Sequence, residues 1–135
     1  MLVFKSLEKR STTKYIVLHH SASSKMSIED IHNYHLSKGW AGIGYHYFID
    51  ANGALHEGRP KNTVGVHCKG YNHCSIGICL QGNFEIEHVT EEQMHSLSML
   101  IQSLLKTYPK AQIKLHRELN STKCPGENFN WRFTN

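Results

Sequence analysis

The chain has 135 residues, of which 39% are hydrophobic and 19% charged, a composition typical of one globular domain rather than a disordered or fibrous protein. The formal charge is +4, but no basic run with interleaved aromatic residues is present, so nucleic-acid binding is not expected. No run of about 18 apolar residues occurs either, so we expect no membrane-spanning segment.

The first predicted elements are a buried strand and a helix. Lys14–His20 (KYIVLHH) is a continuous β-favouring apolar run, which is typical of a strand buried on both faces. Ser27 is a suitable N-cap for a helix that extends through about Lys38, and Gly39 would end it. A strand of this kind usually lies centrally in a sheet that helices cover.

A hairpin and a further strand are predicted next. Tyr45–Asp50 and Ala54–Glu57 flank an Ala-Asn-Gly turn at 51–53, and Asn-Gly readily adopts the positive φ angles of a tight hairpin turn. Ser75–Leu80 (SIGICL) is another apolar run and indicates a second buried strand.

The second predicted helix has the strongest pattern in the sequence. Thr90 and Gln93 form a capping box at its start, and Pro109 would end it. Its apolar residues recur at helical spacing and form one stripe: Met94, Leu97, Ile101, Leu104, Leu105 and Tyr108. Gln112–Leu115 follows as a short strand, and we expect an irregular segment after it. The alternation of helices and strands predicts a single α/β domain over residues 1–135, with a mixed central β-sheet flanked by helices.

The chain is rich in metal-binding side chains, with eleven histidines and four cysteines but no CxxC pair. They gather where predicted strands end, at His19 and His20, at His67, and at His116 with Cys124. Zinc binds imidazole nitrogen and thiolate sulfur, and a catalytic zinc site uses three protein ligands and leaves a fourth position for water. Spacing alone does not separate such a site from structural histidines and cysteines.

Five ordered segments narrow the interpretation. They are IVLHHSA at 16–22, GWAGIGYHYFID at 39–50, EGRP at 57–60, GVHCKGYNHCSIGICLQG at 65–82 and LHRELNSTKCPG at 115–126. In this order they resemble the type 2 N-acetylmuramoyl-L-alanine amidases, a family that includes amidase-type phage lysozymes and peptidoglycan recognition proteins. The resemblance covers about residues 14–126 and is greatest to the phage enzymes. It implies a zinc site at one edge of the sheet.

The resemblance implies that Zn²⁺ is bound by His19, His116 and Cys124. His20 is the alternative to His19, but successive side chains of a strand point to opposite faces, and the small residues that follow favour His19. Recognition proteins of this family that do not cleave peptidoglycan usually lack the cysteine. The presence of Cys124 therefore favours an enzyme.

Two catalytic residues and four substrate contacts are also implied. Tyr45 matches the catalytic tyrosine, although a half-buried strand aromatic is the alternative, and Thr122 matches a threonine that contacts the attacking water or the oxyanion. Residues that match groove positions of the family are expected to contact substrate: His67, Asn72, Trp40 and Arg59. A buried tryptophan and a surface arginine are the alternatives for the last two. We expect His46 to support the sheet, and we assign no role to Cys68 and Cys74.

The resemblance implies hydrolysis of the amide between N-acetylmuramic acid and L-alanine in bacterial peptidoglycan, by a phage or prophage endolysin. The alternatives are a peptidoglycan-binding module without catalysis, a cytoplasmic amidase that recycles wall fragments, and a regulatory partner of another protein, for which the sequence indicates no interface. No signal peptide is visible at the N-terminus, so we expect synthesis in the bacterial cytoplasm and action on the wall after release. Any separate cell-wall-binding module is expected to lie outside this chain.

Overall fold

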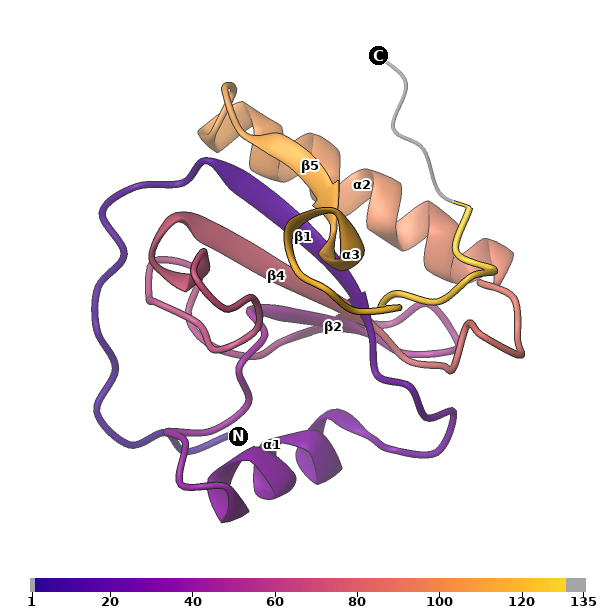
Figure 1. Ribbon diagram of the computed structural model, residues 1–135, viewed down its shortest axis with the longest axis horizontal. Coiled ribbons are helices and arrows are strands. Elements are labelled where there is room, and N and C mark those ends of the chain that lie inside the picture. Colours follow the sequence, from indigo (N-terminus) through magenta and orange to yellow (C-terminus); the bar gives the residue numbers. More distant parts are fainter. Residues whose placement is uncertain (1, 131–135) are drawn as a thin grey trace.

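The computed structural model describes residues 2–130 and has a five-stranded sheet with a helix on each side (Figure 1). The elements, in chain order, are β1 (Tyr15–His20), α1 (Ile28–Ser37), β2 (Tyr47–Ile49), β3 (Leu55–Glu57), the 3₁₀ turn η1 (Asn72–Cys74), β4 (Ser75–Leu80), α2 (Glu91–Thr107), β5 (Gln112–Leu115) and α3 (His116–Leu119). Both long predicted helices and all predicted strands are confirmed, with the hairpin strands shorter than expected. The segment after β5 was expected to be irregular, but it begins with the short helix α3.

The strand order β3-β2-β4-β1-β5 makes the sheet mixed, as predicted. β1 lies parallel to both β4 and β5, β2 lies parallel to β4, and the β2–β3 hairpin supplies the antiparallel edge. Because parallel strands end on the same side of a sheet, the residues after β1, β4 and β5 are brought together. No helix of the described residues is long and apolar enough to cross a membrane.

Two apolar cores hold the helices on opposite faces of the sheet (Figure 1). The larger core joins α2 to alternate residues of β1 and β4, and its fully buried members include Ile16, Leu18, Ile78 and Leu97. The smaller core, under α1, contains Ile28, Ile31, Ile43, Phe48 and Cys79. Burial of each such large apolar side chain contributes about 1.5–3 kcal/mol, so these contacts fix which face of β1 each side chain occupies.

Four buried histidines serve the scaffold, since each accepts a backbone N–H at Nδ1 over 2.9–3.1 Å: His20, His32, His35 and His46. His46 is fully buried; its Nδ1 accepts from the Gly77 N–H and its Nε2 donates to the Thr63 carbonyl. A ring that accepts at one nitrogen and donates at the other is neutral. His46 therefore supports the sheet, as predicted, and it can make both hydrogen bonds only while its imidazole ring is neutral.

The buried state of His46 predicts acid sensitivity. Burial lowers the pKa of His46 to about 4, against an opposing effect of the Thr63 carbonyl. Between pH 6.5 and 4, His46 is protonated in the unfolded chain but stays neutral in the folded chain. The free energy of unfolding therefore decreases as the pH falls, and this residue accounts for a decrease of about 3 kcal/mol. In urea titrations with EDTA, His46→Gln should lose less stability than the unmodified chain over this range. Parallel pH curves for the two proteins would contradict the assignment.

Candidate metal centre

Three side chains converge where β1 and β5 end: His19, His116 and Cys124. Their ligand atoms all lie within 4.8 Å of one another. Leu18 is in register with Leu115, so the next residues along the two parallel strands are His19 and His116, whose rings are 4.5 Å apart. Cys124 arrives on a loop that turns back onto α3, where its carbonyl accepts from the Arg117 N–H at 2.9 Å. The structure thus brings together the three ligands that the sequence predicts.

The alternation of β1 separates the two adjacent histidines. His19 is in register with Cys79, a member of the core under α1. His20 faces the other side of the sheet, where its Nδ1 accepts from the Phe84 N–H at 3.1 Å and its ring lies beside the Phe84 ring. The prediction that His19 rather than His20 belongs to the site agrees with this geometry.

The ring nitrogens leave room for an ion. His116 Nδ1 is a buried side-chain nitrogen without a hydrogen-bond partner, while its Nε2 is 2.8 Å from Asn120 Oδ1. His19 turns its Nδ1 to Cys124 Sγ at 3.7 Å and its Nε2 to His67 Nδ1 at 2.9 Å. Leaving a buried polar atom unpaired costs about 1–3 kcal/mol, and such an atom in a native structure often indicates a missing ion or water. Two imidazoles and one thiol directed at a common point fit a zinc ion.

The electrostatics of the site also suit a cation. Burial, followed by the neighbouring histidines, lowers the pKa of His19 well below its usual value, so its ring is neutral and can offer a lone pair. Burial raises the pKa of the Cys124 thiol to about 12, although the backbone N–H of His20, 3.4 Å from Sγ, lowers it. A bound dication would supply the charge that stabilises the thiolate, because metal binding displaces the thiol proton.

Tyr45 lies between this centre and an open groove. Its ring is 5.0 Å from the His19 ring and 5.9 Å from the His35 ring. Burial, followed by the nearby thiols of Cys79 and Cys124, raises the pKa of Tyr45 well above 10. The phenol therefore keeps its proton at neutral pH, and its hydroxyl shares a side-chain hydrogen bond with the Cys79 thiol while its ring lies beside the His19 ring.

The groove has a volume of about 480 Å³. It is lined by His35, Lys38, Trp40, Tyr45, Val66, His67, Cys68, Lys69, Gly70 and Asn72. The Trp40 ring packs on the His35 ring at 4.5 Å, and Lys38 Nζ lies 4.5 Å above the Trp40 ring, so the indole is a wall of the groove. Three of the four predicted substrate contacts, Trp40, His67 and Asn72, line this groove.

The groove loop over residues 67–72 is held in place by hydrogen bonds to the Asn72 side chain and by the packing of His67 on Gly77. Asn72 Oδ1 accepts from the backbone N–H groups of His67 and Cys68, both at 2.8 Å, so this amide shapes the loop in addition to lining the groove. The His67 ring lies flat against β4 because Gly77 has no side chain: a Cβ there would stand 2.6 Å from His67 Cγ. Gly77 thereby allows His67 to reach His19.

Two predicted residues lie elsewhere. Arg59 is neither a groove residue nor on the surface, since it is 4% exposed and its guanidinium donates to the backbone carbonyls of Ile43 and Val64. Its guanidinium holds the loops at Ile43 and Val64, so the structure places Arg59 outside the groove lining where the substrate contact was expected. Thr122 is exposed and its hydroxyl accepts from the Cys124 N–H at 3.2 Å, but it lines a hollow that shares no lining residue with the groove.

Sequence reasoning missed Asn120 and Cys68. Asn120 Oδ1 is the partner of His116 Nε2, and Cys68 Sγ lies 3.4 Å from the same oxygen. His116 and Asn120 are four residues apart, a spacing that places side chains together on a helix. That signal was hidden because the segment was expected to be irregular.

Comparison with known proteins agrees with this fold and site. The N-acetylmuramoyl-L-alanine amidase family model matches residues 9–127. The endolysin of Escherichia phage T7 is 36% identical over 126 residues, covering 87% of this chain and 83% of that protein. Peptidoglycan-recognition protein SC2 of Drosophila melanogaster is 34% identical over 130 residues, covering 85% and 69%. The solved endolysin amidase LysCS of Clostridium intestinale is 38% identical with a TM-score of 0.91, covering 96% and 85%.

A mixed sheet between two helices, with a His-His-Cys group where its parallel strands end, together with the similarity to a solved endolysin amidase, places the chain in the amidase class of hydrolases. The chain belongs to the N-acetylmuramoyl-L-alanine amidase family, and it is an amidase.

The two faces of β1 give a direct test of the metal ligands. His19→Ala removes a nitrogen directed at the centre and should abolish stoichiometric zinc binding. His20→Ala removes a backbone acceptor on the other face, so it should lower stability while zinc content stays near one per chain. Metal analysis of both purified variants, with urea denaturation of each, provides the measurement. Zinc lost from the His20 variant and kept by the His19 variant would mean that the site uses the opposite face.

Proposed function

We propose that this chain is a zinc-dependent amidase that hydrolyses the bond between N-acetylmuramic acid and L-alanine of peptidoglycan, as a phage or prophage endolysin. The observation that carries the proposal is the unpartnered Nδ1 of His116 beside His19 Nδ1 and Cys124 Sγ. The names of the similar endolysins and recognition proteins support peptidoglycan as the substrate.

In this proposal His19, His116 and Cys124 hold the zinc ion. Zinc would polarise the scissile carbonyl and activate the attacking water, which are the two things that amide hydrolysis needs. Tyr45 remains a protonated donor and stabilises the negative charge that develops on the carbonyl oxygen. Thr122 contributes indirectly, because its hydroxyl accepts from the Cys124 backbone N–H and so holds the turn that carries this ligand.

The groove beside the centre suits a glycopeptide with an anionic stem. Lys38 and Lys69 are exposed side chains of its lining and would attract the carboxylates of a stem peptide. Trp40 offers an apolar wall of the kind on which sugar rings or peptide side chains pack.

Two alternative functions can be distinguished from this proposal: peptidoglycan recognition without cleavage, and recycling of wall fragments. A recognition module would need the groove but not a metal, so the intact His-His-Cys group favours catalysis. A wall-recycling amidase would share the chemistry, and it would act on soluble muropeptides but not on intact walls. Comparing turnover on both substrates separates the endolysin from the recycling enzyme.

The proposed role of Tyr45 predicts a selective loss of turnover. Tyr45→Phe removes one hydrogen-bond donor from the developing oxyanion, so kcat should fall on the order of 10²-fold. Zinc content and the free energy of unfolding should change little. Tyr47→Phe is the matched control, because Tyr47 is half-buried two residues away but packs against the core under α2. Equal turnover of the two variants would assign Tyr45 a structural role.

The bond that is cleaved is the decisive test. Digestion of purified walls should release new α-amino groups on L-alanine without an increase in reducing sugars, leaving long glycan strands without peptide. Mass spectrometry of the products and an assay of reducing ends give both measurements. Cys124→Ser, which replaces the thiolate ligand with a neutral hydroxyl, should be inactive in parallel digests.

Reducing ends without N-terminal alanine would refute the amidase reading, since that is the product of a glycosidase, which works with paired carboxylates. New amino groups on residues other than alanine would keep the zinc hydrolase and change the bond to one within the stem peptide.

A further inference from the structure

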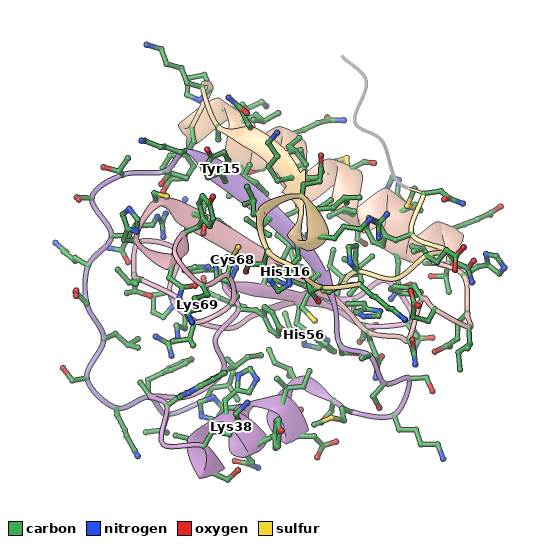
Figure 2. All side chains as sticks on the ribbon, viewed as in Figure 1. Tyr15, Lys38, His56, Cys68, Lys69 and His116 are labelled. Atoms are coloured by element: carbon green, nitrogen blue, oxygen red, sulfur yellow. The ribbon has the colours of Figure 1, made fainter. Side chains whose placement is uncertain are left out.

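The groove loop over residues 67–72 is connected to the Nε2 atoms of both histidines of the candidate metal centre, directly to that of His19 and through Asn120 to that of His116. His67 Nδ1 lies 2.9 Å from His19 Nε2. Asn120 bridges the second connection: its Oδ1 is 2.8 Å from His116 Nε2, and its Nδ2 donates to the Lys69 carbonyl at 3.0 Å. Figure 2 shows Cys68, Lys69 and His116 in the same central region of the molecule.

The orientation of the Asn120 amide is fixed by its neighbours. Nδ2 donates to two carbonyls, those of Lys69 and Leu119, each at 3.0 Å. Only the amide nitrogen can donate, so Oδ1 is the end that faces His116. An oxygen at that position accepts from Nε2–H, which leaves the lone pair of the neutral ring on Nδ1. That is the buried nitrogen without a protein partner.

Cys68 adds a third contact to the same amide. It is 1% exposed, and its Sγ donates to Asn120 Oδ1 at 3.4 Å. The backbone N–H of Asn120 also donates to the His116 carbonyl at 3.0 Å, so the residue is anchored through main chain and side chain together. A side chain held at this many points is preorganised and presents one acceptor to the imidazole.

We propose that Asn120 is a positioning residue that holds His116 in the tautomer and orientation needed to bind zinc, and that joins this ligand to the groove loop through Lys69. The proposal rests on the zinc-dependent function proposed above. Its consequence is that one amide serves two purposes: its oxygen sets the affinity for the metal, and its nitrogen sets the position of the loop that contacts substrate.

Substitutions of Asn120 can separate the role of the amide oxygen from the role of the amide nitrogen. Asn120→Ala removes both, and loss of a partner that orients a ligand histidine typically weakens metal affinity about 10- to 100-fold. Asn120→Asp keeps an acceptor for His116 Nε2 but sets a carboxylate oxygen against the Lys69 carbonyl. It should therefore restore most of the zinc affinity while KM for muropeptides rises. Asn33→Ala, the same change at an exposed position of α1, is the matched control and should leave both unchanged.

The experiment measures Zn²⁺ affinity by competition with a chromophoric chelator, and the visible spectrum after Co²⁺ loading, which reports ligand geometry without turnover. Unfolding of each metal-free variant shows whether the fold itself is altered. Asn120→Ser, which is also too short to reach His116, replaces the alanine variant if that protein does not fold. Weakened zinc binding and a changed Co²⁺ spectrum in the Ala or Ser variant, rescued by Asp, are the expected results.

Two outcomes would overturn the proposal, and they are distinguishable. If the unmodified chain takes up no zinc, the proposed function fails and the role of Asn120 fails with it. If the unmodified chain binds zinc, and Asn120→Ala binds it equally tightly with an unchanged Co²⁺ spectrum, the proposed function stands and the positioning role alone is rejected.

Discussion

A neutral imidazole has one lone pair, and the hydrogen bond made by the other nitrogen decides where that lone pair points. The arrangement of the candidate centre depends on this constraint. His67 and Asn120 contact the Nε2 atoms of His19 and His116, so both Nδ1 atoms are turned towards Cys124. Around them, His35 and His46 accept backbone N–H groups and are likewise neutral, because burial lowers the pKa of each to about 4. The face of the sheet under α1 therefore holds several imidazoles without accumulating positive charge, which would oppose a bound cation.

Tyr45, which is half-buried, is likewise held in one protonation state by its surroundings. A phenol surrounded by thiols and apolar side chains keeps its proton, as the raised pKa of Tyr45 indicates. Cys79 contributes to this environment because it packs under α1 at the register position of His19. The smaller core therefore has a chemical effect as well as a mechanical one, since Tyr45 packs against it and is held beside the candidate centre in its protonated form.

Most of the fold could be predicted from the sequence, because local patterns determine it. The capping box of Thr90 and Gln93 and the stripe of α2 are short-range signals, and both are present in the structure. The alternation of β1 likewise separates His19 from His20. The failures concern side chains whose role depends on distant backbone. Arg59 donates to the carbonyl of Ile43, and Asn120 donates to the carbonyl of Lys69, 51 residues earlier in the chain. No local pattern contains that information.

Gly77 carries a consequence for how this sequence can vary. In a central strand, replacing glycine with alanine would ordinarily be tolerated, since it adds β-compatible side-chain surface and reduces the freedom of the unfolded chain. At this position the added methyl group would occupy the space of the His67 ring, which in turn touches His19. A library screened for folding and a library screened for metal uptake should therefore select differently at residue 77. At residue 77 the central strand would then be constrained by the candidate metal centre rather than by the packing of the core.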